Sequence, residues 1–325
     1  MGRALQSISE ATLTKKRVAV PLSAGVIGTL LFINFLWGGT TVAAKIAMNY
    51  VPPYTLAFLR FSLAAVLMYG IARFRRTDMR VNRSDWGRFW ALGVLGLALT
   101  YILTYLGILR TSAANAALLI ATEPIYLTVL SAFLLYEVLT RRRIAGIALG
   151  IVGVYLIISN GLVLRHTSEA TMGDLLIAGG LAFEALSSIV GKELVSKYPT
   201  MTVMSYQLTL GALALAPFAL SDLWNFNRSH ATLHFHLSAV LALFYLIVPC
   251  TVFAYTVWFA LLDKHEAGDM SAFLFLQPVV GALLGVLIEG DAFTRYTWAG
   301  AVFVLTALFV IPQCKRNNPG PILWN

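Results

Sequence analysis

Four charged side chains and three amides interrupt apolar stretches of the chain and could do chemistry there. They are Lys45, Arg60, Glu123, Glu184, Asn34, Gln207 and Gln277. A charge near the centre of a bilayer costs about 2.5–3.5 kcal/mol on insertion scales, so each one needs a partner or a role. These residues are therefore the first candidates for a binding or coupling site inside a membrane.

The segments around several of these residues occur twice. Residues 110–137 align without a gap with residues 264–291, which lie 154 positions later, and residues 37–45 align with residues 184–192, 147 positions later. The chain is therefore one unit duplicated. Duplicated apolar units of this size build membrane transporters whose site lies between the halves.

Arg60 and Glu123 in the first copy correspond to Gln207 and Gln277 in the second. Both charges become amides together, which is expected if the two side chains pair, because loss of one partner would leave the other uncompensated. Two interpretations stay open. The pair could fix helix packing, or it could bind the charged end of a substrate, for which Arg60 would suit a carboxylate.

Glu184 corresponds to the apolar Trp37, so the repeat offers it no evident partner. An unpaired carboxylate inside a membrane could take up a proton near neutral pH. A coupling proton or a substrate ammonium group is therefore one expectation for Glu184. The alternative is a protonated glutamate that forms a hydrogen bond across a helix interface.

Aromatic residues accompany these polar ones along the expected helices. They include Trp37, Tyr101, Tyr105, Tyr255 and Trp258, of which Tyr101 and Tyr255 recur in register at the offset of 154. A symmetric aromatic lining would favour a partly apolar solute. Simple packing, or a place in the belt at the membrane interface, is the alternative.

Two prolines and two glycines are candidate hinges. Pro124 and Pro278 occupy equivalent positions near the middle of expected spans, and each removes one helical hydrogen bond. The resulting bends could let the halves rock, although prolines in membrane helices are also common as plain kinks. Gly38 and Gly39 permit a hinge or close helix packing, and we favour packing.

Membrane-spanning helices must position all of these residues. The chain is 58% hydrophobic and 12% charged, whereas a soluble domain carries about 25% charged residues. The apolar runs approach the roughly 20 residues of a spanning helix, and a barrel would instead show alternating segments of about ten. We predict an all-α membrane protein with ten transmembrane helices, at residues 26–47, 54–72, 87–109, 112–136, 141–160, 173–193, 201–220, 236–261, 267–288 and 295–313.

Five spans per half reverse the second copy in the bilayer, which gives two inverted five-helix repeats at residues 26–160 and 173–313. The flanking segments, 1–25 and 314–325, are expected to be cytoplasmic, because 18 Lys and Arg residues fall on their side and 4 on the other. This predicts a multi-pass protein of the plasma or bacterial inner membrane. The net charge of +9 is then a topology signal and a weak attraction to the lipid bilayer, with no nucleic acid as a partner.

Several short motifs occur in a fixed order within the duplicated unit. They are Trp37-Gly38-Gly39, Arg60-Phe61, Thr111-Ser112-Ala113, Pro124, and Glu137 with Thr140 and Gly146. In these features nearly the whole chain resembles the drug/metabolite transporter superfamily and its EamA branch. The resemblance implies a ten-helix carrier that exports metabolites, amino acids among them. The departures at Glu184 and Gln277 leave the substrate and the coupling ion open.

Nothing in the sequence indicates an enzyme, a cofactor or a metal site. All five histidines fall in expected loops, at positions His166, His230, His234, His236 and His265. Nucleotide-binding and hydrolase motifs such as GxxxxGK[ST], HExxH and GxSxG are missing from the sequence. The runner-up classes are a uniporter or channel and a membrane-embedded lipid enzyme.

We therefore expect a secondary transporter that exports a small-molecule substrate by alternating access. An amino acid or related compound with an apolar or aromatic part fits the residues above, and a proton is the candidate coupling ion. The protein is expected to act as a monomer or a homodimer.

Overall fold

A computed structural model describes residues 22–110, 119–137, 139–159, 168–228, 236–284, 287 and 295–310. The predicted terminal segments 1–25 and 314–325 lie wholly or mostly outside these residues, as do Thr111 to Ala113 and His166, His230 and His234. Throughout the described ranges the regular elements are helices, without a strand.

The described helices fall in all ten predicted spans. The first half contains α2 (Ala24–Gly38), α3 (Thr40–Met48), α4 (Pro53–Phe74), η1 (Arg83–Asp85), α5 (Trp86–Trp90), η2 (Ala91–Leu99), α6 (Thr100–Ile108), α8 (Glu123–Leu134) and α9 (Arg141–Ser159). The second half contains α10 (Ser168–Val195), α11 (Thr200–Arg228), α12 (Leu237–Tyr245), η3 (Leu246–Phe253), α13 (Ala254–Leu262), α14 (Ala267–Ser271), η4 (Ala272–Phe275), α15 (Leu276–Leu284) and α16 (Arg295–Val310).

Among the residues that the structure describes, six helical stretches are long and apolar enough to cross a membrane, and two shorter apolar helices accompany them. Large apolar side chains such as Phe32, Val66 and Trp298 are exposed on the outer surface, where lipid would cover them. The protein is thus an all-α membrane protein, as predicted.

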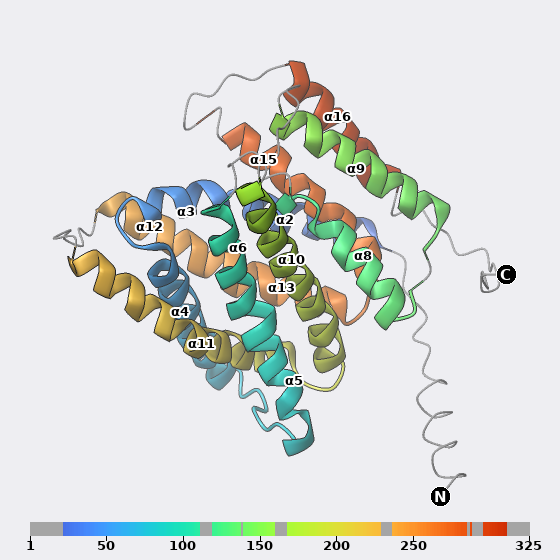
Figure 1. Cartoon of the computed structure of the whole chain (residues 1–325). Coiled ribbons are helices and arrows are strands. Elements are labelled where there is room, and N and C mark those ends of the chain that lie inside the picture. The colour runs from blue at the N-terminus through green and yellow to red at the C-terminus, as the bar shows by residue number, and fades with distance from the viewer. Residues whose placement is uncertain are drawn as a thin grey trace, which may run out of the picture.

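Equivalent helices of the two halves pack in equivalent ways. Helix α4 packs on α11, and α9 packs on α16; each of these pairs joins corresponding spans. The α6–α10 contact between the third and sixth spans has its counterpart in the α13–α2 contact between the eighth and first spans, and the α8–α10 contact has its counterpart in the α15–α2 contact. Figure 1 shows α9 and α16 lying side by side at one edge of the bundle. The packing therefore follows the duplication, with the two five-helix repeats inverted about a shared axis.

Several spans are interrupted, or change from α-helix to π-helix, near their middle. The first span breaks at Gly39, between α2 and α3, and the third and eighth spans contain the π-helical stretches η2 and η3 at equivalent positions. A π-helix is rare and is frequently found at functional sites. The irregular backbone of both halves thus gathers at one level of the bundle.

The candidate hinge residues occupy these irregular places. Pro124 lies in the first turn of α8, directly after a turn at Ala121 and Thr122, so it begins a helix instead of bending one. A proline in the first turn costs no helical hydrogen bond, because that N–H would have no partner in any case. Pro278 follows the 3-10 stretch η4 in the same way. The expectation of a mid-helix kink at Pro124 was therefore wrong.

Gly38 and Gly39 allow close packing, the interpretation favoured from the sequence. A Cβ atom on Gly38 would lie 2.5 Å from the Cβ of Val280, and one on Gly39 would lie 2.5 Å from the hydroxyl of Tyr245. That hydroxyl donates a hydrogen bond to the carbonyl of Leu36 at 2.7 Å. The first span is therefore held tightly against two helices of the second half.

Candidate functional site

A cavity of about 200 Å³ lies between the two halves, and residues from both repeats line it. Ten of the eleven residues predicted to bind substrate or couple to it meet there: Trp37, Arg60, Tyr101, Tyr105, Glu123, Glu184, Gln207, Tyr255, Trp258 and Gln277. The eleventh, Asn34, is fully buried behind the wall. Residues up to 240 positions apart in the chain thus form one polar and aromatic chamber.

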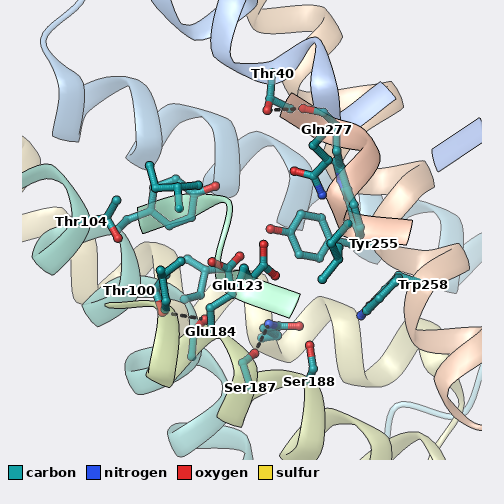
Figure 2. Close-up of a pocket in the computed structure, with 18 of the residues that line it drawn as sticks. Thr40, Thr100, Thr104, Glu123, Glu184, Ser187, Ser188, Tyr255, Trp258 and Gln277 are labelled. Atoms are coloured by element: carbon teal, nitrogen blue, oxygen red, sulfur yellow. Dashed lines mark hydrogen bonds between the residues drawn. The ribbon is translucent and has the colours of Figure 1, made fainter. Parts of the chain in front are cut away.

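Two glutamates occupy the middle of this chamber (Figure 2). Glu123 is the first residue of α8, and Glu184 lies in the middle of α10. Both carboxyl groups line the cavity. Figure 2 shows Thr100 and Thr104 on one side of them, and Tyr255, Trp258 and Gln277 on the other.

Arg60 is buried and held by groups other than the two glutamates. Its Nε donates a hydrogen bond to the Thr251 hydroxyl at 2.8 Å, and its Nη1 donates to the Tyr101 hydroxyl at 3.2 Å. Within the described part of the chain Arg60 forms no ion pair. The Arg60–Glu123 pair that the matched amides suggested is therefore not formed.

The π-helical stretch η3 supplies the anchor for Arg60. The hydroxyl of Thr251 donates a hydrogen bond to the carbonyl of Leu246, five residues earlier, at 2.7 Å. This leaves the hydroxyl oxygen free to accept from Arg60. Among the described residues, Nη2 of Arg60 has no hydrogen-bond partner, so a fixed cation with spare donors lines the cavity.

The amides are ordered by neighbours behind the wall. Nε2 of Gln277 donates to Oδ1 of Asn34 at 3.2 Å, and Nδ2 of Asn34 donates to the carbonyl of Leu30 at 2.8 Å. Asn34 thus orients Gln277. Nε2 of Gln207 donates to the Ser187 hydroxyl at 3.2 Å, while its buried Oε1 has no partner within the described residues. A buried acceptor of this kind is costly unless a ligand or water satisfies it.

Aromatic rings form one wall of the cavity. Trp37 donates its Nε1–H to the carbonyl of Cys250 at 2.9 Å and meets the rings of Tyr255 and Trp258 edge-on, with centroids 5.2 and 5.5 Å away. Tyr101 and Tyr105 pack edge-on at 5.7 Å. These rings offer a rigid apolar surface and, through their π faces, attraction for a cation.

Five hydroxyl side chains and one glycine also line the cavity, and we did not predict them. They are Thr40, Thr100, Thr104, Ser187, Ser188 and Gly96. Ser187 and Ser188 follow Glu184 by three and four residues, so they share its helix face, and that spacing could have identified them. A Cβ on Gly96 would lie 2.3 Å from the Cβ of Ser187, a contact that the sequence alone does not reveal.

Comparison with known proteins gives a consistent result. The EamA-like transporter family matches the chain twice, at residues 24–159 and 171–312. An uncharacterized transporter of Archaeoglobus fulgidus is 30% identical over 85% of this chain and 94% of its own. A protein of Salmonella typhimurium named a probable amino-acid metabolite efflux pump is 28% identical over 86% of this chain and 92% of its own. A solved crystal structure, 19% identical, superposes with a TM-score of 0.74 over 88% of this chain and 98% of that one.

Proposed function

The chain belongs to the EamA-like transporter family of the drug/metabolite transporter superfamily, and from this premise we propose that it is a secondary carrier of a small zwitterionic metabolite. Its relatives are named transporters and efflux pumps, so the chain is a multi-pass membrane transporter. An amino acid with an apolar side chain is the substrate that we favour.

The observation that carries this proposal is the charge pattern of the cavity. Arg60 lines it as a fixed cation, and Glu123 and Glu184 line it as carboxyl groups. An amino acid has a carboxylate that suits the planar fork of Arg60 and an ammonium group that suits a carboxylate. The Trp37–Tyr255–Trp258 wall would then contact the apolar part. The name of the Salmonella typhimurium relative supports this substrate class.

We propose that a proton exchanges with the substrate at the two glutamates. Two neighbouring carboxylates repel each other, which favours a shared proton while the cavity is empty. An arriving ammonium group would supply the positive charge and displace that proton. Transport would then use the proton gradient, and export from the cytoplasm is the direction that we favour, on the basis of the relatives' names.

We place the carrier in the plasma or bacterial inner membrane with both termini in the cytoplasm. The end of the bundle that carries the arginines from Arg73 to Arg88 would face the cytoplasm, in accordance with the positive-inside rule. We call it the basic end. Alternating access would expose the cavity at this end and at the opposite end in turn.

Counterflow in proteoliposomes tests the carrier proposal. Liposomes preloaded with a mixture of unlabelled amino acids should transiently accumulate an external labelled amino acid, because a carrier exchanges substrate across the membrane. The same liposomes without the internal pool are the control. Equal uptake with and without the internal pool would favour a channel and contradict the proposal.

A further inference from the structure

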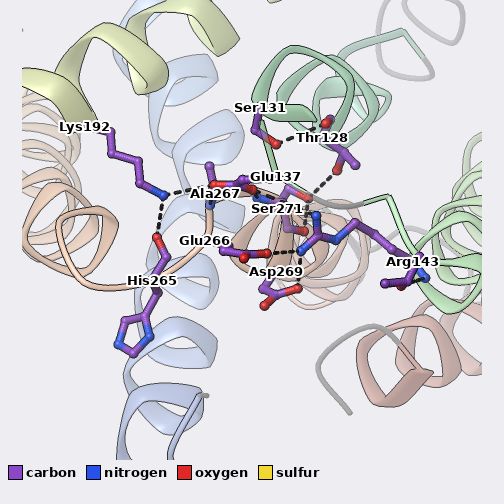
Figure 3. A network of polar contacts seen from close by, with 12 residues as sticks. Thr128, Ser131, Glu137, Arg143, Lys192, His265, Glu266, Ala267, Asp269 and Ser271 are labelled. Atoms are coloured by element: carbon purple, nitrogen blue, oxygen red, sulfur yellow. Dashed lines mark hydrogen bonds and ion pairs between the residues drawn. The ribbon is translucent and has the colours of Figure 1, made fainter. Parts of the chain in front are cut away.

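A network of charged side chains lies beyond the cavity, towards the basic end of the bundle (Figure 3). The Glu137 carboxylate accepts hydrogen bonds from Lys192 at 3.0 Å, from the N–H of Ala267 at 2.8 Å and from the N–H of Gly268 at 2.9 Å. Lys192 also donates to the carbonyl of His265 at 2.7 Å. The Glu137 side chain is only 5% exposed, so this contact is desolvated and specific.

Arg143 of α9 forms the second part of the network. Its Nη2 pairs with Glu266 at 2.8 Å and with Asp269, and the Arg143 side chain is 3% exposed. A Cβ on Gly268 would lie 2.7 Å from its Nη1, so a larger residue at this place would have to displace the guanidinium. Figure 3 shows Arg143 reaching from α9 towards Glu266 and Asp269.

The network joins the two repeats. Glu137 and Arg143 belong to the first repeat, and Lys192 and the segment from His265 to Asp269 belong to the second. Closer to the cavity, the hydroxyls of Thr128 and Ser271 form a hydrogen bond at 2.8 Å between the same repeats.

Buried residues connect the network to the cavity wall. Along the ninth span, every residue between Asp269 of the network and Leu274 of the cavity wall is buried. The cavity residue Phe259 is also buried, at 2% exposure. This part of the ninth span is therefore packed inside the protein between the network and the cavity.

The aligned positions of the other copy repeat only some of the charged residues of this network. The counterparts of Glu137, Lys192, Ala267 and Gly268 are Asp291, Lys45, Ala113 and Ala114, which keep the carboxylate and the lysine. The counterparts of Arg143, Glu266 and Asp269 are Thr297, Ser112 and Asn115, which carry no charge. The three charges of the Arg143 cluster are thus not repeated at the aligned positions of the sequence.

From this asymmetry we propose that Glu137, Lys192 and Arg143 form the gate at the basic end, and that the ion pairs of Arg143 bias the empty carrier towards the conformation closed at this end. A contact made in only one of two conformations shifts their populations by its full free energy. This inference rests on the proposed carrier function, since gates require alternating access.

Chemical accessibility of the cavity from each side of the membrane tests the gate. A reporter, Ser188→Cys, is placed in the cavity wall of a chain carrying Cys250→Ala and Cys314→Ala. The probe is a positively charged, membrane-impermeant methanethiosulfonate, applied to inside-out and to right-side-out vesicles. The gate variant is Arg143→Gln, and the matched control is Arg141→Gln, which removes the same charge from an exposed position on the same helix.

Arg143→Gln should accelerate reporter modification roughly tenfold from the basic end, a typical size for a conformational coupling. It should also slow modification from the opposite end, whereas the Arg141→Gln control leaves both rates unchanged. Equal rates in the two variants, or acceleration from both ends, which indicates unfolding, would overturn the proposal. If Arg143→Gln does not give a monodisperse protein, Asp269→Asn removes one of the ion pairs of Arg143 and is judged by the same two rates.

The assay reads thiol chemistry and needs no transported substrate. If the amino-acid proposal is wrong, counterflow of amino acids is not observed, but Arg143→Gln still accelerates reporter modification from the basic end and slows it from the opposite end. If the gate proposal is wrong, Arg143→Gln leaves the reporter modification rates unchanged, but counterflow of amino acids is still observed.

Discussion

At the scale of single residues, the cavity contains two kinds of charged group. Arg60 carries a fixed positive charge, whereas the two glutamates are the groups proposed to bind and release a proton. Arg60 is anchored by Thr251 and Tyr101, so it can meet a substrate carboxylate without rearrangement. Glu123 and Glu184 line the same cavity and form no ion pair within the described residues. We therefore propose that Arg60 orients the substrate and that the two glutamates exchange the proton.

Replacing Arg60 with lysine should weaken amino-acid binding by about ten- to a hundredfold, because a charged hydrogen bond contributes roughly 1.5–3 kcal/mol. Lysine keeps the charge but loses the planar fork and the simultaneous contacts with Thr251 and Tyr101. Ligand-induced shifts of the thermal unfolding midpoint, measured across a concentration series, give the two dissociation constants. Unchanged binding in Arg60→Lys would show that Arg60 does not contact the substrate.

Glu184→Gln should abolish the effect of an imposed proton gradient on amino-acid transport while exchange between equal pools continues. The amide cannot carry the exchanged proton, yet it keeps the shape of the side chain. Glu193→Gln is the matched control, because Glu193 is exposed on the same helix, nine residues further on. Transport by Glu184→Gln that still follows the gradient would rule out this residue as the coupling group.

At the scale of elements, close helix contacts set the size and position of the cavity. The π-helical stretches η2 and η3 recur at equivalent positions of the two copies, and both supply cavity contacts: Gly96 lines the wall, and Thr251 anchors Arg60. Irregular helices beside a cavity expose backbone and side-chain groups that a regular helix would use internally. These stretches therefore belong to the site as much as the charged residues do.

Gly96→Ala should push η2 away from α10 and destabilise the protein by about 1–3 kcal/mol, the usual cost of overpacking. The new Cβ would lie 2.3 Å from the Cβ of Ser187, and Ser187 itself bonds to Gln207. Gly70→Ala is the control, because a Cβ there meets nothing within 4 Å. Thermal unfolding in detergent should separate the two variants, and equal midpoints would refute the packing argument.

At the scale of the whole molecule, two inverted copies of one unit enclose a site that neither copy could form alone. Residues of both repeats line the cavity, and the Glu137–Lys192 and Arg143 contacts join the repeats at the basic end. The copies share a framework, but they differ in the charges placed on it. We attribute the fold to the framework that the two copies share. We attribute the proposed difference between the two ends of the carrier to the charged residues that differ between the copies.

The contacts between the repeats should make stability depend on pH. Burial raises the pKa of the Glu137 carboxyl, but Lys192 and the N–H groups of Gly268 and Ala267 together outweigh it, so the pKa lies below its ordinary value of 4.5. Glu137 therefore adds stability that is present above pH 4.5 and is lost as the pH falls through its folded-state pKa. Arg143, Glu266 and Asp269 are the other charged groups that face this carboxylate or its partners.

Thermal unfolding of Glu137→Gln between pH 7 and pH 3 tests this dependence. The variant should be less stable than the parent at pH 7, and the difference should shrink as the pH falls below about 4.5. Glu193→Gln should follow the parent throughout. A difference that stays constant over the whole range would contradict the assigned role of the Glu137 carboxylate.

The sequence was sufficient to predict the spans and ten of the 21 residues that line the cavity, because the length of the apolar runs reports on the membrane and the mismatches between the copies report on a site. Ten predicted residues meet in one cavity. The partner of Arg60 could not be predicted, since Thr251 is an ordinary residue whose position depends on the π-helical stretch η3. The break before Pro124 and the approach of Gly96 to Ser187 likewise depend on tertiary packing.

The most direct test of the central claim is thermal unfolding of the purified protein with matched sets of compounds. Each apolar amino acid is compared with the amine that lacks its carboxylate and with the carboxylic acid that lacks its amino group. The account predicts that at least one amino acid raises the unfolding midpoint, because binding to the folded state stabilises it, and that neither of its matched compounds does so at equal concentration. Equal stabilisation by the amine or by the carboxylic acid alone would contradict a site built for both charges.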